Sequence, residues 1–128
     1  MIAIYLVVAL ILAFFLLQYG MVLKMRMKKG KPAPELTGSY AKALKTGNKS
    51  LFYFYSPGCG ACRPMTPLIE KMMKQYKNIF KVNISQDMDT ARRFGVMGTP
   101  ATILVRDGRI AEFLVGPQQE KRIIELMQ

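Results

Sequence analysis

Two cysteines separated by two residues are the part of this sequence that could carry covalent chemistry. Cys59 and Cys62 lie in the segment SPGCGACRP, residues 56–64. On the first turn of a helix this spacing lets the two sulfurs close a disulfide, and the free amides and dipole of the helix N-terminus favour a thiolate at Cys59. We therefore expect Cys59 to attack a substrate disulfide and Cys62, one turn in and less exposed, to resolve the mixed intermediate.

Two other interpretations of this cysteine pair are half of a zinc site and a structural disulfide. Zinc prefers four ligands, and the chain has two cysteines and no histidine, so a zinc site would need a dimer. A structural disulfide across so short a loop would add little stability. The absence of histidine also excludes a histidine base and any Cys-His or Ser-His pair within this chain. The sequence therefore favours a redox-active pair, with no bound cofactor and no metal.

The residues around the cysteine pair predict alternating strands and helices. The apolar run 51–55 predicts a buried strand, and apolar residues at spacings of three and four from Met65 to Tyr76 predict a helix that begins near Cys59 and is kinked by Pro67. Further strands are expected at 79–84, 101–105 and 110–115, with a hairpin turn at 107–108. Helices are expected at 39–44, 90–94 and 118–127. A turn at 46–48 would follow the first of them, and Asp87 or Asp89 would cap the second. This order predicts an α/β fold, a mixed central sheet flanked by helices on both faces.

The first 23 residues contain no charged side chain. As a helix, residues 2–23 would span roughly 33 Å, which suits a hydrocarbon core of about 30 Å. A cleaved signal would need a basic stretch before the apolar run and a small-residue cleavage site after it, and a buried core helix would show a polar face. We therefore divide the chain into a transmembrane anchor (1–23), a basic juxtamembrane linker (24–34) and a catalytic domain (35–128).

Five cations follow the apolar segment within eight residues and predict contact with anionic lipid headgroups rather than with nucleic acid. They are Lys24, Arg26, Lys28, Lys29 and Lys31. Basic residues next to a membrane segment are held on the cytoplasmic side, so this cluster places the catalytic domain in the cytoplasm. The periplasmic or outer face is the alternative location of the domain.

The order of these features resembles thioredoxin. Five features occur in the thioredoxin order over roughly residues 36–128. They are a strand, a C-x-x-C pair, a helix with proline five residues after the second cysteine, a second strand, and Gly98-Thr99-Pro100 before a hairpin. The resemblance implies a thioredoxin-like fold and dithiol–disulfide exchange with protein partners and with an upstream redox partner. A thiol-based metal handling or assembly factor, holding a soft ion such as Cu(I) on the two thiolates, is the alternative, and a non-catalytic docking domain is disfavoured because both cysteines are present.

The resemblance also implies roles for individual residues. Pro100 would be a cis-proline that faces the cysteines, although from the sequence alone a trans proline opening a strand is the ordinary expectation. Substrate contacts are expected at Gly58, Gly60, Ala61, Thr99, Pro100 and Gly116, and Tyr55 would pack under the site.

The sequence departs from the family pattern at three places. Gly58 stands where tryptophan usually precedes the first cysteine, and the dipeptide Gly60-Ala61 lacks the common proline. The family's buried carboxylate, which assists proton transfer at the second cysteine, falls on Tyr53. Lys81, the usual partner of that carboxylate, is present, either as a supporting residue or as a strand residue with its amine in solvent.

Overall fold

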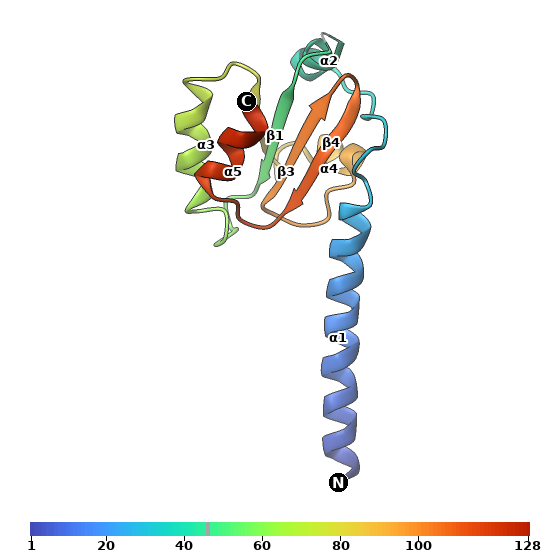
Figure 1. The fold of residues 1–128 in the computed structure, drawn as a ribbon. Helices are drawn as coiled ribbons and strands as arrows, with labels where there is room; N and C mark the ends of the chain where they lie inside the picture. Colours follow the sequence, from blue (N-terminus) through green and yellow to red (C-terminus); the bar gives the residue numbers. More distant parts are fainter. Residues whose placement is uncertain (46) are drawn as a thin grey trace.

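The computed structural model describes residues 1–45 and 47–128. In chain order, the elements are α1 (Ile2–Arg26), α2 (Gly38–Lys45), β1 (Ser50–Tyr55), α3 (Met65–Met73), β2 (Ile79–Asn83), α4 (Met88–Phe94), β3 (Ala101–Arg106), β4 (Arg109–Val115) and α5 (Glu120–Met127). Figure 1 shows α1 as a long stalk that projects from the folded remainder of the chain.

Within the described residues the strands form one mixed sheet in the order β2-β1-β3-β4. β1 runs parallel to β2 and antiparallel to β3, and β3 pairs antiparallel with β4. The register places Phe54 opposite Ala101 and Ala101 opposite Val115. The carboxyl end of β1, the beginning of β3 and the end of β4 therefore lie at the same end of the sheet, which brings the cysteine segment and the loop before β3 together (Figure 1).

Helices cover both faces of this sheet, as the sequence predicts. Because successive side chains of a strand point to opposite faces, Leu51 and Tyr53 pack against α3 and α5, whereas Phe52 and Phe54 pack on the other face with Phe94 of α4. The aromatic run of β1 is buried at both faces, which explains why it is apolar throughout rather than alternating. The expected α/β fold with a mixed sheet is confirmed.

The largest difference from the sequence prediction concerns α3. The regular helix begins at Met65, not near Cys59, and residues 60–64 form turns. Pro64 and Pro67 have no backbone N–H, so neither can donate to the carbonyl four residues earlier. Pro67 is the third residue of α3, so it lies in the first turn, where the missing N–H breaks no intrahelical hydrogen bond, rather than in the interior of a longer helix.

Other boundaries differ by one or two residues. α4 begins at Met88 and is capped by Asp87, whose carboxylate accepts from the Thr90 N–H, and α5 begins at Glu120. The turn expected at 46–48 falls partly on Thr46, which lies outside the described residues. The expected hairpin turn at Asp107 and Gly108 is present, and both residues have positive φ.

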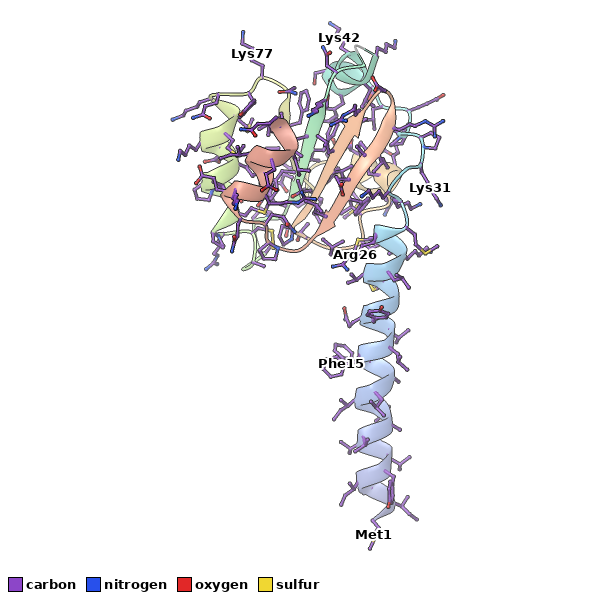
Figure 2. All side chains as sticks on the ribbon, viewed as in Figure 1. Met1, Phe15, Arg26, Lys31, Lys42 and Lys77 are labelled. Carbon is purple, nitrogen blue, oxygen red and sulfur yellow. A yellow bond between two sulfur atoms is a disulfide. The ribbon has the colours of Figure 1, made fainter. Side chains whose placement is uncertain are left out.

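Helix α1 is apolar on all sides, and Figure 2 shows its side chains, Phe15 among them, projecting away from the folded domain. Within the described residues it is the one helix long and apolar enough to cross a membrane. Its last turn is different, because Met25 is only 3% exposed and belongs to the core that contains Phe94 and Phe113. The end of α1 is therefore packed against the domain.

The segment that the sequence presents as a linker is hydrogen-bonded to the edge of the sheet. Gly30 N–H donates to the carbonyl of Ile110 at 2.7 Å, the Ile110 N–H donates to Lys31 at 2.8 Å, and Ala33 N–H donates to Gly108 at 2.8 Å. Residues 30–33 thus extend the sheet beyond β4, which fixes the direction in which α1 leaves the domain.

Candidate redox site

Cys59 and Cys62 form a disulfide in the loop between β1 and α3, with their Cα atoms 5.3 Å apart. Cys62 is 2% exposed, whereas Cys59 is only partly buried. Cys59 lines a surface depression together with Tyr55 and Thr66. Cys62 lines the same depression but is almost fully buried, so Cys59 is the more accessible residue of the pair.

The backbone around the disulfide places a donor at Cys59. The N–H of Cys62 donates to the sulfur of Cys59 at 3.1 Å, and the Cys59 N–H donates to Ser56. A hydrogen bond to sulfur favours the anionic form over the neutral thiol. Because α3 begins only at Met65, this single local amide takes the place of the regular helix N-terminus that the sequence predicts.

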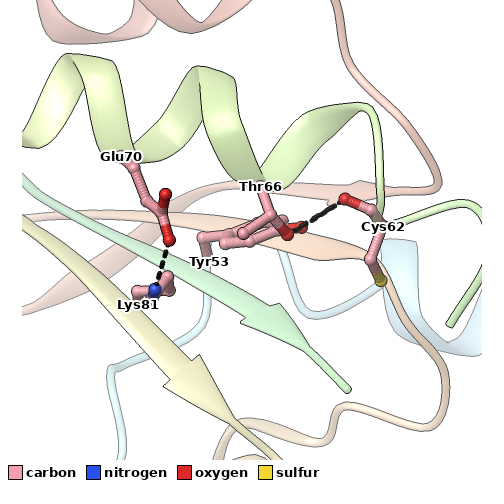
Figure 3. Close-up of polar contacts among 5 residues, drawn as sticks. All are labelled: Tyr53, Cys62, Thr66, Glu70 and Lys81. Atoms are coloured by element: carbon pink, nitrogen blue, oxygen red, sulfur yellow. Dashed lines mark hydrogen bonds and ion pairs between the residues drawn. The ribbon is translucent and has the colours of Figure 1, made fainter. Parts of the chain in front are cut away.

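Behind the disulfide, the residue that stands in place of the family's buried carboxylate is tied to the second cysteine. The Tyr53 hydroxyl lies 2.8 Å from the hydroxyl of Thr66 and donates to the Cys62 carbonyl at 3.3 Å, while Thr66 donates to the same carbonyl at 3.0 Å. Figure 3 shows both hydroxyls directed at that carbonyl, with the Cys62 sulfur pointing away from them. These groups therefore position the backbone of Cys62 and do not contact its sulfur.

Burial governs the titration of Tyr53. Desolvation raises the pKa of the Tyr53 hydroxyl above its ordinary value, and the hydrogen bond with Thr66 partly opposes this rise. The phenol is therefore neutral at physiological pH and acts as a hydrogen-bonding group.

Lys81 does not have its amine free in solvent. Its ammonium donates to the Glu70 carboxylate on α3 at 2.7 Å (Figure 3). The same ammonium lies 5.4 Å from the centre of the Tyr55 ring. The hydrogen bond with Glu70 raises the pKa of Lys81, and burial opposes the rise. Tyr55 in turn stacks on Tyr53 with ring centres 5.7 Å apart, so Lys81, Tyr55 and Tyr53 form one connected group next to the Cys59 depression.

The other predicted site residues lie at the same end of the sheet. The Thr99–Pro100 peptide is cis, as the resemblance implies, and Pro100 is buried directly before β3. Gly116 follows β4 and donates its N–H to the Pro100 carbonyl at 2.9 Å. The register of β1 with β3 places Pro100 beside the end of β1, from which the chain passes to Cys59.

The remaining predicted positions are open to solvent. Gly58, Gly60 and Ala61 are exposed, and a Cβ atom built at either glycine would meet nothing within 4 Å. The two glycines therefore leave open space on either side of Cys59 in the chain.

Sequence reasoning missed three residues that the fold brings to this region. Thr66 and Glu70 lie on α3, and Met25 on α1 accepts a hydrogen bond on its sulfur from the Met97 N–H at 3.3 Å, next to the loop before Pro100. Thr66 lies seven residues after Cys59 and Glu70 four residues further on, one helical turn apart on α3. That helical spacing is the signal that could have found the first two. No local pattern identifies Met25.

A strand, a two-residue cysteine spacing in the following loop and a cis-proline at the same end of a mixed sheet define a thiol–disulfide exchange domain. The family model for thioredoxin matches residues 33–128. The chain belongs to the thioredoxin family, and it is a thiol–disulfide oxidoreductase whose redox-active group is a cysteine pair.

Individual relatives agree with this assignment. The chain is 30% identical to thioredoxin of Bacillus subtilis over 77 residues, which cover 58% of this chain and 74% of that protein. It is 31% identical to mouse protein disulfide-isomerase A4 over 107 residues, or 75% of this chain and 17% of the relative. The structure of Fasciola hepatica thioredoxin superposes with a TM-score of 0.60 at 23% identity, covering 69% of this chain and 88% of that one. This last likeness supports the fold.

Proposed function

We propose that this protein is a membrane-tethered thiol–disulfide oxidoreductase in which Cys59 is the nucleophile and Cys62 the resolving thiol. The observation that carries the assignment is the asymmetry of the pair. Cys59 is accessible and receives the Cys62 N–H on its sulfur, whereas Cys62 is buried at 2% exposure. Attack by a large partner is possible only at the accessible sulfur.

In the reducing direction, the Cys59 thiolate attacks one sulfur of a partner disulfide and the other partner sulfur leaves as a thiolate. The Cys62 thiol then loses its proton and attacks Cys59 in the mixed disulfide. This step releases the second partner sulfur and closes the Cys59–Cys62 disulfide. Two electrons pass to the partner, whose two thiolates take up one proton lost by Cys62 and one from solvent. The reverse sequence oxidises a partner dithiol.

Partner binding is proposed at the loop before β3 and at the end of β4. In the part of the chain that the structure describes, the backbone of Thr99 makes no hydrogen bond, so its N–H and C=O are available to an extended partner segment. Pro100 and Gly116 flank that segment, while Gly58, Gly60 and Ala61 leave the opposite side open. Tyr55 and Lys81 support the loop from below.

Tethering is proposed to occur through α1, with residues 1–23 in the bilayer. Residues 1–23 are uncharged and largely exposed, and the helix continues without a break through Lys24 to Arg26, with Met25 packed into the domain. This continuity between the apolar helix and the domain core supports an anchor. The five juxtamembrane cations would lie against anionic headgroups and favour a cytoplasmic location of the domain.

The test of the exchange function is trapping with the full chain in membranes. Cys62→Ser should accumulate mixed disulfides between Cys59 and client proteins, because attack persists while resolution is lost, and Cys59→Ser should trap none. Separation of trapped complexes under non-reducing conditions measures this. Absence of any trapped complex, together with failure of the unaltered protein to exchange with a soluble disulfide peptide, would refute the proposal.

The test of sidedness is a pair of reporter fusions after Gln128. A reporter that fluoresces only in the cytoplasm should be active, and a reporter that requires export should be inactive. The opposite result would place the domain on the periplasmic or outer face.

A further inference from the structure

The direction in which α1 leaves the domain is set by a series of contacts along β4. Followed backwards from residue 33 to residue 25, the chain runs beside β4 from its first residues toward its end at Val115. The contacts, in order, are Ala33 with Gly108, Gly30 with Ile110, Lys29 with Glu112, and Met25 with Met97. α1 therefore continues past the Val115 end of the sheet.

The redox site lies at this same end. Val115 pairs with Ala101, which follows Pro100, and Ala101 pairs with Phe54 one residue before the end of β1. Figure 1 shows the loop between β1 and α3 at the lower end of the domain, the end from which α1 descends. The hairpin turn between β3 and β4 lies at the opposite end. The six residues of β3 separate the two ends by roughly 20 Å.

Little of the chain separates the apolar part of α1 from the domain. Lys24 is the first charged residue after the apolar segment, and Met25, next to it, already contacts the Met97 N–H. Met97 in turn precedes Pro100 by three residues, a stretch of at most about 11 Å. With α1 across a bilayer, the loop before Pro100 therefore lies at the level of the lipid headgroups.

From this placement we propose that the Cys59–Cys62 site faces the membrane surface, and that its partner is an integral membrane protein whose cysteine pair lies at headgroup level. The inference rests on the tethering in the proposed function. The domain cannot turn its site away from the bilayer, because Met25 is buried and residues 30–33 are hydrogen-bonded to β4. A cysteine pair within a few residues of a transmembrane segment meets Cys59 directly, whereas one held far above the bilayer reaches the opposite end of the domain.

The first experiment measures the height of the two ends above the bilayer. The full chain with Cys59→Ser and Cys62→Ser is placed in nanodiscs that contain headgroup-nitroxide lipids, and a fluorophore is attached to Ala61→Cys or to Arg106→Cys. Both positions are exposed, the first beside the site and the second at the opposite end of β3. Strong quenching at position 61 and weak quenching at position 106 are expected. Equal quenching, or stronger quenching at position 106, overturns the inference.

The second experiment tests the class of partner with the unaltered chain in nanodiscs. Two transmembrane peptides carry the same cysteine pair as a disulfide, one directly after the membrane segment and one raised on a rigid helical spacer of about 20 Å. The near disulfide should react about tenfold faster or more, because the fixed geometry gives it the higher effective concentration. Insertion of a flexible Gly/Ser segment between Lys24 and Met25 should remove this preference.

The outcomes separate this inference from the proposed function. Equal rates with the near and raised disulfides, or reaction with a soluble disulfide peptide alone, overturn the membrane-facing partner while leaving disulfide exchange intact. Failure to react with all three substrates overturns the exchange function itself.

Discussion

Replacement of Tyr53 by phenylalanine tests whether the hydroxyl that stands in place of the family's carboxylate has a structural role. The side chain is fully buried, and its hydroxyl bonds to Thr66 and to the Cys62 carbonyl. Tyr53→Phe removes these bonds but leaves the carbonyl with donors from the Thr66 hydroxyl and from the N–H groups of Met65 and Thr66. Since no remaining group loses all its partners, the free energy of unfolding should fall by about 1 kcal/mol.

The matched change is Thr66→Val, which removes the other hydroxyl and should also cost about 1 kcal/mol. The two hydroxyls are 2.8 Å apart, so the single effects should not add. The double variant should be less destabilised than their sum by about 0.5 to 1 kcal/mol. Urea denaturation of the oxidised full chain in mild detergent measures these differences as midpoint shifts of about 0.3 to 1 M per kcal/mol.

The effect of Tyr53→Phe on stability should depend on pH, because the pKa of Tyr53 is raised in the folded protein. A group whose pKa is higher in the folded state stabilises the fold while it is protonated, and this contribution is lost as the pH rises through the folded pKa. The unaltered protein should therefore lose stability above its unfolded tyrosine pKa of about 10 more steeply than Tyr53→Phe does. The difference between the two proteins should narrow at alkaline pH.

Exchange chemistry gives the result that would refute the reasoning. Because the hydroxyls reach the Cys62 carbonyl and not its sulfur, Tyr53→Phe should leave the thiol–disulfide equilibrium with glutathione and the pH profile of exchange unchanged (Figure 3). A displaced pH profile would mean that Tyr53 moves protons at Cys62. Exact additivity of the two variants would show that the hydroxyls do not interact.

Three further predictions concern positions away from this pair. Met25→Ala should destabilise the domain by about 2 to 3 kcal/mol, because it leaves a cavity in a buried site. The control Met27→Ala changes a residue that is 64% exposed. It should alter stability by less than about 0.5 kcal/mol in the same urea denaturation assay. Gly58→Trp should leave stability within about 0.5 kcal/mol, since nothing lies within 4 Å of the added Cβ, and a larger loss measured by thermal unfolding would contradict the open surface. Glu70→Gln removes the partly exposed ion pair with Lys81 and should lower the free energy of unfolding by less than about 1 kcal/mol near neutral pH. Because Glu70 raises the pKa of Lys81, the difference in stability between the two proteins should vanish when denaturation is measured above that pKa.

The sequence by itself determined the chemistry and the order of the elements. Two cysteines two residues apart indicate thiol–disulfide chemistry, and the absence of histidine excludes a histidine base or a Cys-His pair within the chain. The aromatic run at 51–55 and the helical spacing after Met65 are local patterns, and local patterns report which face of an element is buried. The order of strands and helices therefore follows from local periodicity, and the resemblance of that order and of the cysteine and proline motifs to thioredoxin supplied the expected fold.

The start of α3 could not be predicted from the sequence pattern, because a helix boundary depends on which backbone N–H groups can form hydrogen bonds. The apolar periodicity begins at Met65, and the regular helix also starts there, because Pro64 and Pro67 lack the N–H groups that a helix from Cys59 would need. The amide that serves the Cys59 sulfur is consequently that of Cys62 in a turn. Spacing alone could not distinguish this turn from the first turn of a helix.

Only the tertiary structure decided what surrounds the cysteines and which way they face. Thr66 meets Tyr53, and Glu70 meets Lys81, because α3 packs over β1 and β2, and Met25 becomes a core residue because the chain before residue 33 pairs with β4. These contacts join residues distant in the chain, and their sequence signals are single polar or apolar side chains that fit many environments. The orientation of the redox site relative to α1 follows from strand register, which no stretch of sequence records by itself.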